Sequence, residues 1–403
     1  MKIYVVDSIM GSGKTSAAID KMNKDKENNY IFITPFLKEV DRIKKSCIDR
    51  KFMEPENKGK GKLDNLQYLI SERYNIASTH ALFTTYNDYT KELLRNNDYI
   101  LILDEVFNVL EMIPLHKDDI ELMLKNFAYI DDDCFVVWTD DAYDGTKFRE
   151  IKLMAKNRTL MLIDGVLLLW NFPSDIFTVF KEVYILTYMF DAQIQKYYYD
   201  INNIEINYIG VEKKNSIYKF SDKHYIPEYT KTLKNNINIL EDSKLNQLGD
   251  TETALSVSWF ERDKKKRKKP LMKKLKDNLI NVFNNRFKSS SDDNMWTTYK
   301  EFKSHISGKG YTKGFVSVNA RATNDYRHKK YLAYCANIFL NPYLKNYFLS
   351  KGVNVLEEKY ALSEMIQWIW RSAIRDNKPI NIYIPSSRMR NLLIDWLDKI
   401  NKL

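Results

Sequence analysis

An apolar run near the N-terminus turns abruptly into small residues and then Lys-Thr in the segment VVDSIMGSGKT, residues 5–15. A strand that ends in a glycine-rich loop and reopens as a helix presents unpaired backbone N–H groups together with the positive end of the helix dipole. That local geometry favours an anion. The chain has only 12 glycines in 403 residues, so two of them within three positions, followed by a basic residue and a hydroxyl, constrain this segment strongly.

The segment matches the P-loop pattern G-x-x-x-x-G-K-S/T at Gly13, Lys14 and Thr15, while Ser8 stands where the first glycine would be. In that pattern the lysine reaches the β- and γ-phosphates and the hydroxyl binds Mg²⁺. The sequence therefore predicts a site for ATP and Mg²⁺ whose phosphate-binding residues are Gly11, Ser12, Gly13, Lys14 and Thr15. The alternative is a strand-to-helix turn that binds no ligand.

A second apolar segment, Tyr99–Leu103, delivers Asp104 and Glu105 at its C-terminal end. Ligands of an open α/β sheet bind at that end of the strands. In P-loop enzymes such an aspartate holds Mg²⁺ opposite the P-loop threonine, and the next glutamate can polarise the attacking water. We therefore predict Thr15 and Asp104 as metal ligands and Glu105 as a catalytic residue. Alone, an apolar strand ending in Asp-Glu could merely start a turn or cap a helix.

Length and composition indicate a soluble protein with two domains. Hydrophobic residues make up 44% and charged residues 29% of the chain, as in globular proteins. The longest apolar stretch, Leu160–Trp170, is interrupted by Asp164 and is too short to span a bilayer, and no signal-peptide pattern precedes the P-loop. Three scattered cysteines support neither a disulfide framework nor a zinc site. We therefore expect no membrane partner and a reducing, cytoplasmic location.

The formal net charge of +10 favours a polyanionic partner. The excess is partly local, because the segment ERDKKKRKKPLMKKLK, residues 261–276, holds ten basic residues. Such a run is either a solvated loop or a segment that follows the phosphates of a nucleic acid. With the Ser/Asp-rich segment 288–294 it resembles the border of an insertion.

Short apolar runs alternate with helical patterns throughout, which is typical of a parallel sheet covered by helices. The predicted fold class is α/β, with a boundary near residue 190. Expected strands of the first half are 3–6, 31–33, 83–85, 99–103, 135–138 and 183–187. In the second half we expect strands at 204–209, 254–259, 314–318 and 380–384, and helices at 331–339, 364–375 and 389–400.

Several segments resemble, in order, the motifs of superfamily 2 helicases. GSGKT (11–15), TPFLK (34–38), STHALFTT (78–85) and Asp104-Glu105 are similar to motifs I, Ia, Ib and II, and ILTYMF (185–190) is similar to motif III. NARATN (319–324) and QWIWRSAIR (367–375), followed by IYIPS (382–386), resemble the C-terminal motifs of phage-encoded helicases of the DEAD/DEAH-like type. The resemblance spans nearly the whole chain. It implies two RecA-like parallel-sheet lobes, 1–190 and 191–403, with a basic insertion at about 261–310 in the second lobe.

The resemblance further implies that Gln367 and Arg371 belong to motif VI, which usually reads Q-x-x-G-R-x-x-R. Arg375 stands one position beyond the second arginine of that pattern. The spacing i, i+4, i+8 predicts that Gln367, Arg371 and Arg375 line one face of a helix and act together as catalytic residues. A guanidinium from the second lobe would neutralise charge on the γ-phosphate. The alternative is a solvated polar stripe.

Nucleic-acid contacts are implied by the same resemblance. Hydroxyls and backbone amides in loops that follow strands bind phosphates, and Thr34, Thr79 and Thr84 stand in such loops. Arg321 and Asn324 are further candidates for nucleotide or strand, although Asn319 and Asn324 could simply cap turns.

We therefore expect an ATP-dependent helicase or translocase, acting on DNA rather than RNA in phage replication or recombination. We expect a monomeric protein that acts in the cytoplasm of the bacterial host and has replication proteins as partners. One alternative is a packaging motor, which would need converging nuclease carboxylates. The aspartates at 131–133, 140, 141 and 144 instead suggest solvated loops. A second alternative is a module that binds DNA and uses nucleotide only as a switch.

Overall fold

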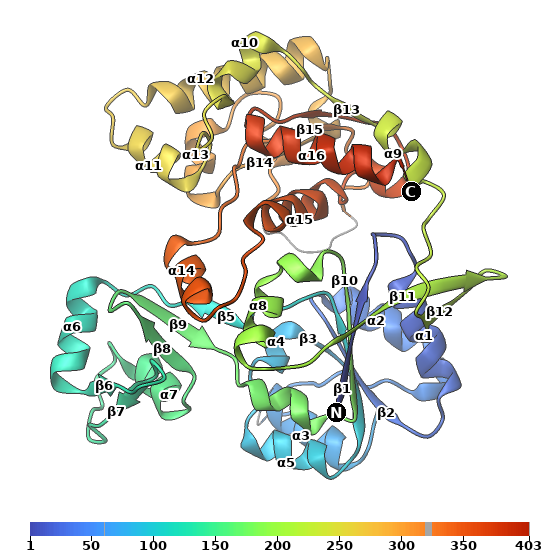
Figure 1. Cartoon of the computed structure of the whole chain (residues 1–403), viewed down its shortest axis with the longest axis vertical. Coiled ribbons are helices and arrows are strands. Elements are labelled where there is room, and N and C mark those ends of the chain that lie inside the picture. Colours follow the sequence, from blue (N-terminus) through green and yellow to red (C-terminus); the bar gives the residue numbers. More distant parts are fainter. Residues whose placement is uncertain (60, 319–324, 403) are drawn as a thin grey trace. The chain divides into compact units, whose positions relative to one another are not determined.

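The computed structural model describes residues 1–59, 61–318 and 325–402, and its chain divides into two compact units (Figure 1). Unit 1 comprises Met1–Ser8, Gly13–His224 and Asn341–Val355. Unit 2 comprises Ile9–Ser12, Tyr225–Leu340 and Leu356–Leu403. The expected division at residue 190 therefore falls inside unit 1. This unit also includes the much later segment Asn341–Val355. Contacts within each unit, rather than a single cut in the sequence, define the two cores.

A seven-stranded sheet in the order β12-β11-β1-β10-β4-β2-β3 forms the centre of unit 1. All its neighbouring strands are parallel except β11 and β12, which form an antiparallel hairpin at one edge. The interior strand β4 is buried over its whole apolar run, as expected when helices cover both faces of a sheet. The strands are β1 (Lys2–Asp7), β2 (Asn29–Thr34), β3 (Ile76–Thr79), β4 (Tyr99–Asp104), β10 (Glu182–Thr187), β11 (Asn207–Lys214) and β12 (Ile217–Ser221).

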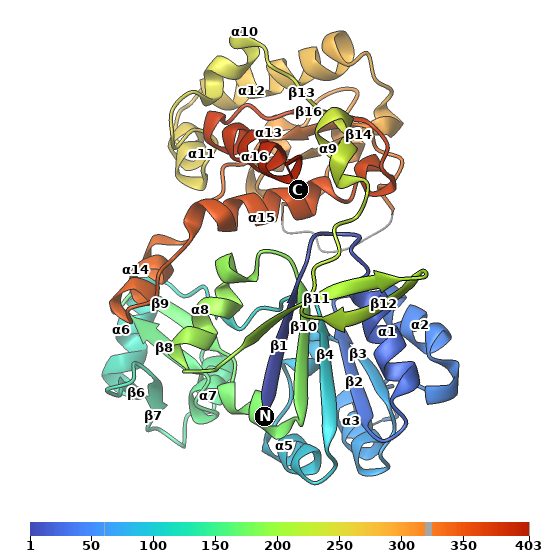
Figure 2. The same ribbon diagram turned by 45° about the vertical axis from the view of Figure 1, so that its right-hand side comes forward.

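The helices of unit 1 connect these strands, and Figure 2 shows α1 and α2 beside the sheet. Buried Ala17, Ala18 and Met22 of α1 pack with Phe32 and Ile102 in one core. The helices are α1 (Lys14–Lys24), α2 (Leu37–Ser46), α3 (Lys62–Ser71), α4 (His80–Phe83), α5 (Asp88–Arg95), α8 (Ile194–Ile201) and α14 (Pro342–Ser350). The late helix α14 belongs to this unit because its Phe348 packs on Tyr197 of α8, with ring centroids 5.2 Å apart.

Between β4 and β10 the chain builds a small segment with its own core, visible apart from the main sheet in Figure 2. Trp138 and Phe148 lie in this core, and Phe127 stacks on Trp138 at 5.7 Å. The elements are β5 (Leu110–Met112), α6 (Lys117–Asn126), β6 (Ala128–Ile130), β7 (Val136–Trp138), α7 (Arg149–Lys156), β8 (Leu160–Ile163) and β9 (Leu167–Asn171). The sequence patterns did not separate this segment from the sheet around it.

Unit 2 contains a four-stranded parallel sheet in the order β13-β16-β15-β14. Its strands are β13 (Ile237–Ile239), β14 (Asn294–Thr297), β15 (Tyr331–Tyr334) and β16 (Ile380–Tyr383). Its helices are α9 (Thr230–Asn236), α10 (Ser243–Asn246), α11 (Val257–Lys264), α12 (Pro270–Asn281), α13 (Lys303–Ile306), α15 (Glu357–Ile369) and α16 (Ser387–Ile400). One parallel sheet and one mainly parallel sheet, both with covering helices, confirm the α/β class.

Helices α11 and α12 show that the basic run 261–276 is not a loose insertion. Phe260 of α11 and Leu275 of α12 are fully buried and lie in one core with Trp296 of β14. Buried Asp263, near the end of α11, accepts hydrogen bonds from the backbone N–H groups of Leu271 (3.1 Å) and Met272 (2.9 Å) at the start of α12. A carboxylate that caps the first turn of a helix satisfies donors that have no partner inside the helix. The expected insertion is therefore part of the unit 2 core.

Four other sequence expectations were wrong. The expected strand 83–85 is instead the end of helix α4 and the turn after it, because Phe83 packs in an aromatic cluster with Phe107 and Phe172. Residues 257–264 form α11 because the Ser256 hydroxyl accepts from the N–H of Trp259 and caps a helix. The expected helix 331–339 begins as strand β15, which lies between β14 and β16. The expected strand 314–318 makes only an isolated bridge between Phe315 and Trp296.

Within residues 1–59, 61–318 and 325–402, no helix combines the length and apolar character needed to cross a membrane. Cys47, Cys134 and Cys335 are all free thiols.

We expect Asp263→Ala to lower the free energy of unfolding by about 1 to 3 kcal/mol, because two buried backbone N–H groups would lose their acceptor. Urea unfolding followed by circular dichroism measures the change. Glu261→Ala is the matched control, since the Glu261 side chain pairs with Lys264 at 3.5 Å on the same helix, in a partly exposed pair. Equal stability of the two variants would show that Asp263 does not hold the start of α12.

Candidate nucleotide site

The loop between β1 and α1 has the backbone shape of a phosphate-binding loop. Gly11 and Gly13 adopt positive φ angles of 72° and 86°, in the left-handed region that glycine enters without a Cβ penalty. Gly13 caps helix α1, and its carbonyl accepts from the N–H of Ala17 at 2.8 Å. Lys14 and Thr15 form the first turn of the helix. The predicted strand, loop and helix are all present, and the first turn of a helix carries backbone N–H groups that have no acceptor within the helix itself.

Side chains from β1, α1 and β4 meet at this loop. The Thr15 hydroxyl donates to Asp104 Oδ1 at 3.1 Å. The Lys14 ammonium donates to the backbone carbonyl of Ser8 at 2.5 Å. Glu105 follows β4 with a positive φ of 73°, and its N–H donates to the carbonyl of Leu186 at 3.0 Å. The structure thus brings together Lys14, Thr15, Asp104 and Glu105, which the sequence analysis had assigned to one site.

The ionisable groups of this site have shifted pKa values. Burial lowers the pKa of Lys14 to about 8, although the negative charges of Glu105, Asp7 and Asp104 act in the opposite direction. Burial, reinforced by the charge of Glu105, raises the pKa of Asp104 to about 7. Carboxylates held close together out of water are costly in the ionised form unless a cation accompanies them. Perturbed lysine and carboxyl groups at a strand edge are typical of a functional site.

The residues present fit the binding of Mg²⁺ and a nucleotide. Mg²⁺ prefers oxygen ligands and usually takes only one or two carboxylates together with substrate phosphates. Thr15 and Asp104 supply such oxygens, and the described residues contain no cluster of three or more His, Cys, Asp or Glu side chains that would hold a metal by itself. The hydroxyls of Ser8 and Ser12 are buried and form no hydrogen bond with any described residue. A bound phosphate would supply partners for such hydroxyls.

Two residues that the sequence analysis did not single out support the loop. Both carboxylate oxygens of Asp7, at the end of β1, accept backbone hydrogen bonds, from Met189 at 2.8 Å and from Phe190 at 3.0 Å. Asp7 thereby ties β1 to the segment after β10. Tyr218 of β12 lies directly against Gly13, where an added Cβ would come within 2.1 Å of its ring. The position of Asp7 at the end of the first expected strand could have indicated its role. No neighbouring residue in the sequence indicates that Tyr218 packs on Gly13.

The threonines predicted to contact nucleic acid lie near the carboxyl edge of the unit 1 sheet. Thr34 and Thr79 are paired residues at the ends of β2 and β3. The Thr34 hydroxyl is buried without a hydrogen-bond partner among the described residues. The Thr84 hydroxyl donates to the carbonyl of Ala81 at 2.9 Å and stabilises the end of α4. Arg321 and Asn324 lie outside the described residues.

The expected helical face with Gln367, Arg371 and Arg375 is wrong. Helix α15 ends at Ile369, Arg371 lies in the following turn, and Arg375 belongs to a short 3₁₀ helix, residues 373–376. Arg371 is buried in unit 2, whereas Arg375 is exposed. The helix stops because the chain turns at Trp370–Ser372, where the N–H groups of Arg371 and Ser372 bond three residues back instead of four.

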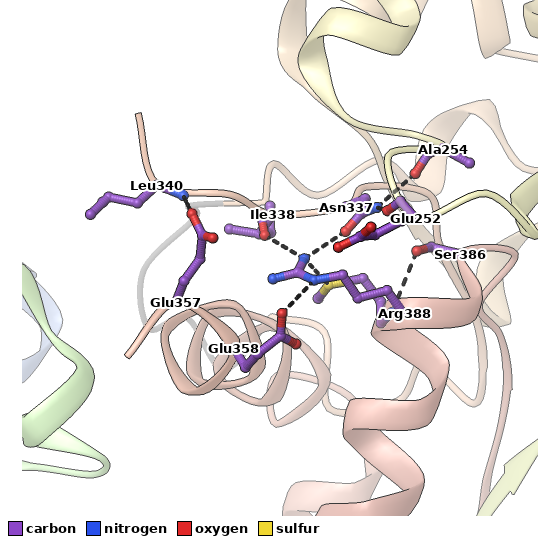
Figure 3. Close-up of polar contacts among 10 residues, drawn as sticks. Glu252, Ala254, Asn337, Ile338, Leu340, Glu357, Glu358, Ser386 and Arg388 are labelled. Atoms are coloured by element: carbon purple, nitrogen blue, oxygen red, sulfur yellow. Dashed lines mark hydrogen bonds and ion pairs between the residues drawn. The ribbon is translucent and has the colours of Figure 1, made fainter. Parts of the chain in front are cut away.

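Arg388, at the start of α16, is a third residue that the sequence analysis missed (Figure 3). Its guanidinium donates to Glu358 of α15 at 2.9 Å, and to the side chain of Asn337 and the carbonyl of Ile338, both at 2.7 Å. The Asn337 amide in turn donates to the carbonyls of Glu252 and Ala254. These bonds hold together the loop after β15 and two helices of unit 2, which is a structural role.

The aspartates of the β6–β7 region form no metal site. Asp131 accepts from the backbone N–H groups of Asp133 and Phe135 and pairs with Arg158 at 2.7 Å. Asp141 pairs with Lys156. These carboxylates close turns and surface ion pairs, as the solvated-loop interpretation predicted.

We expect Gly13→Ala to lower the free energy of unfolding by about 2 kcal/mol, because the new Cβ would be strained by the positive φ and would clash with the Tyr218 ring. Thermal unfolding measures the loss. Gly59→Ala is the control, since Gly59 also has a positive φ, of 100°, but nothing lies within 4 Å of an added Cβ. Adding Tyr218→Ala should recover part of the loss at Gly13, and no recovery would disprove the contact.

Comparison with known proteins identifies the family of the chain. A Bacillus subtilis (strain 168) protein, described as SPbeta prophage-derived uncharacterized protein YonV, is 47% identical over 412 residues, covering 98% of this chain and 99% of the relative. The family model described as YonV C-terminal Rossmann-like domain matches residues 231–397. The model described as YonV middle domain matches residues 110–170, which coincide with the small segment from β5 to β9.

Solved structures similar to this chain include one described as S. tokodaii Xpd4, with 12% identity, a TM-score of 0.48, and coverage of 98% of this chain and 94% of that chain. Another is described as a hypothetical ATP-dependent RNA helicase from Sulfolobus tokodaii, with 12% identity, a TM-score of 0.27, and coverage of 99% and 90%. Identity along nearly the full length of the Bacillus protein, together with matches to two of its domain models, shows that the chain belongs to the YonV family.

Proposed function

We propose that the protein is an ATP-dependent nucleic-acid helicase or translocase of the superfamily 2 type. The hydrogen bond between Thr15 and Asp104 carries the proposal, because it joins a P-loop helix to a strand-end carboxylate in the arrangement that P-loop ATPases use. The resemblance of the sequence segments to helicase motifs supports the step from ATPase to motor.

Each residue of the site has a role in this proposal. Lys14 neutralises the β- and γ-phosphates of ATP, and the N–H groups of Gly11, Ser12 and Gly13 cradle them. Thr15 and Asp104 hold Mg²⁺, which would draw charge from the phosphate oxygens when bound. Glu105 lies next to Asp104 with its backbone fixed by Leu186, and it orients the attacking water. Arg371 stabilises charge on the γ-phosphate, and Gln367 assists it.

The nucleic-acid part of the proposal rests on the strand ends of unit 1 and on the overall charge. Thr34 and Thr79 lie side by side where a phosphate could accept from hydroxyl and backbone donors. The relative is prophage-derived, which supports a role in phage replication or recombination inside the bacterial cytoplasm. We propose DNA as the substrate, with Thr84, Arg321 and Asn324 as further contacts, a monomeric protein, and replication proteins as partners.

Three measurements on the full chain test the function: ATP binding, ATP hydrolysis and strand displacement. Hydrolysis is assayed alone and with single-stranded DNA, double-stranded DNA or single-stranded RNA, and displacement is assayed on duplexes with 3′ or 5′ tails. Stimulation by DNA and displacement from one tail polarity would support the helicase. Stimulation by double-stranded DNA without displacement favours a packaging-type motor, and binding without turnover favours a nucleotide-switched module. Absence of both ATP binding and hydrolysis would overturn the proposal.

We expect Lys14→Ala to reduce ATP turnover by at least about 100-fold without loss of folding, because the lysine supplies the charge that the phosphates need. Glu105→Gln should also stop turnover but retain bound ATP, since it removes only the group that orients water. Steady-state hydrolysis and retention of radiolabelled ATP separate the two effects. Lys24→Ala, an exposed lysine later on α1, is the control. Hydrolysis at the parental rate in Lys14→Ala would refute the phosphate-binding role.

The two arginines should differ, because the structure places them in different environments. We expect Arg371→Ala to lower kcat about 10³-fold while changing ATP affinity much less, as for a group that acts in the transition state. Arg375→Ala should leave kcat within about threefold, since Arg375 is exposed outside α15 and its spacing departs from the motif. Both variants are measured at saturating DNA.

Thermal unfolding of Arg371→Ala and Arg371→Lys provides the check on folding, because Arg371 is buried. A folded Arg371→Lys protein with normal kcat would contradict the assignment, and so would an equal loss in Arg371→Ala and Arg375→Ala.

A further inference from the structure

The basic run of unit 2 has a definite architecture. We define the cationic turn as residues 264–269, KKKRKK, which join α11 to α12. Together with its flanks, residues 261–276, it contains ten basic and two acidic residues, a local excess of eight of the formal net charge of +10. Nearly the whole charge imbalance of the chain is therefore concentrated in one short segment.

The turn is held by its own backbone and by buried side chains. The N–H of Lys266 donates to the carbonyl of Asp263 at 3.0 Å, and the N–H of Lys269 donates to the carbonyl of Lys266 at 3.2 Å. Asp263 caps the start of α12, and its side chain is fully buried. The inward faces of α11 and α12 pack into the unit 2 core through Phe260, Met272 and other fully buried residues. A binding surface fixed in this way loses little conformational entropy when it meets a partner.

The positive charges of the turn are largely uncompensated. Lys264 lies 3.5 Å from Glu261, and Lys266 lies 3.8 Å from Asp263. Exposed Lys265, Arg267 and Lys268 form no ion pair with the described acidic residues. The positive field reaches the neighbouring helix α13, where burial and then the charges of Lys269 and Lys264 lower the pKa of His305.

The surroundings of the turn restrict the chemistry of its partner. Among the exposed large hydrophobic residues of the described chain, Val257 at the start of α11 is the one that lies on α11 or α12. The surface therefore lacks the apolar side chains that insert into a membrane interface, and it lacks exposed aromatic rings on which bases stack. What it offers is a row of flexible cations on a rigid base, which suits a linear polyanion.

We propose that the cationic turn binds the phosphate backbone of a nucleic acid without reading its sequence, as a contact additional to the strand ends of unit 1. The inference rests on the proposed function for the identity of its partner, but not for the site itself. Lys265, Arg267 and Lys268 contribute most, because they are exposed and have no acidic neighbour to displace. Such a contact would make binding strongly dependent on salt.

The test compares two triple variants of the full-length protein, each of which changes the formal charge from +10 to +4. Lys265→Glu/Arg267→Glu/Lys268→Glu alters the turn. Lys44→Glu/Lys45→Glu/Lys125→Glu alters exposed lysines on α2 and α6 and is the matched control. Fluorescence anisotropy measures the affinity for a labelled 20-nucleotide single strand and its duplex between about 50 and 200 mM NaCl. Thermal unfolding checks the fold, and ATP hydrolysis without nucleic acid checks the nucleotide site.

We expect the turn variant to lose at least about tenfold in affinity for nucleic acid, and the slope of log K against log salt to fall by about 2 to 3. The control should keep most of its affinity, and both variants should keep parental ATP hydrolysis in the absence of nucleic acid. Unchanged affinity and slope in the turn variant would overturn the inference while leaving the proposed function intact, and so would an equal loss in the control.

Two further outcomes bear on the partner. If the parental protein hydrolyses ATP but binds neither oligonucleotide, the nucleic-acid part of the proposed function fails together with this inference. Binding to vesicles containing phosphatidylserine that is abolished in the turn variant, without nucleic-acid binding, would assign the surface to a membrane and would also overturn it.

Discussion

The hydrogen bond from Thr15 to Asp104 links the first turn of α1, the helix after β1, to the end of β4, and the positions of both depend on the whole unit 1 sheet. Strands β1 and β4 do not pair directly, because β10 lies between them and pairs with both. The register of β10 places Thr187 beside Asp7 and Leu186 beside Asp104. A slip of one residue in either pairing would turn a carboxylate to the opposite face of the sheet. The site is therefore a consequence of sheet register, even though its residues come from two local motifs.

The same site is electrostatically costly without a ligand. Burial lowers the pKa of Lys14 and raises those of Asp104 and Asp7, so each group resists the charge that its role requires. The buried hydroxyls of Ser8 and Ser12 lack partners among the described residues. Proteins commonly retain such local penalties at functional sites, where a ligand offsets them. A nucleotide with its cation would supply opposite charge and hydrogen-bond partners to these groups at the same time.

Unit 2 uses buried and half-buried polar residues differently, to connect its helices and loops. Asp263 caps α12, Asp242 accepts from the N–H groups of Lys244 and Leu245 at the start of α10, and Arg388 joins the loop after β15 to α15. These residues form hydrogen bonds with backbone groups that have no partner within the helices, or ion pairs with neighbouring side chains. The cations between α11 and α12 are consequently displayed on a rigid part of the domain, which gives a run of low sequence complexity a defined place on the surface.

The sequence by itself determined the local chemistry of the nucleotide site and the α/β class. The shape of the loop at Gly11–Gly13 follows from residues adjacent in the chain, and the apolar run ending in Asp104 forms a buried strand wherever it is placed in a parallel sheet. Where a strand was expected and a helix formed, or the reverse, the segment is an apolar run whose periodicity does not distinguish a helix from a strand. The segment beginning at Tyr331 became a strand because β14 and β16 pair with it on both sides.

Only the tertiary structure decided which distant segments share a core. Phe348 returns to unit 1 because it packs on Tyr197, and the segment from β5 to β9 separates because Trp138 and Phe148 bury one another. The end of α15 before Arg371, and the placement of Tyr218 on Gly13, likewise depend on residues far away in the sequence. Turn and capping preferences act between near neighbours and are readable from the chain, whereas burial depends on contacts that exist only after the chain has folded.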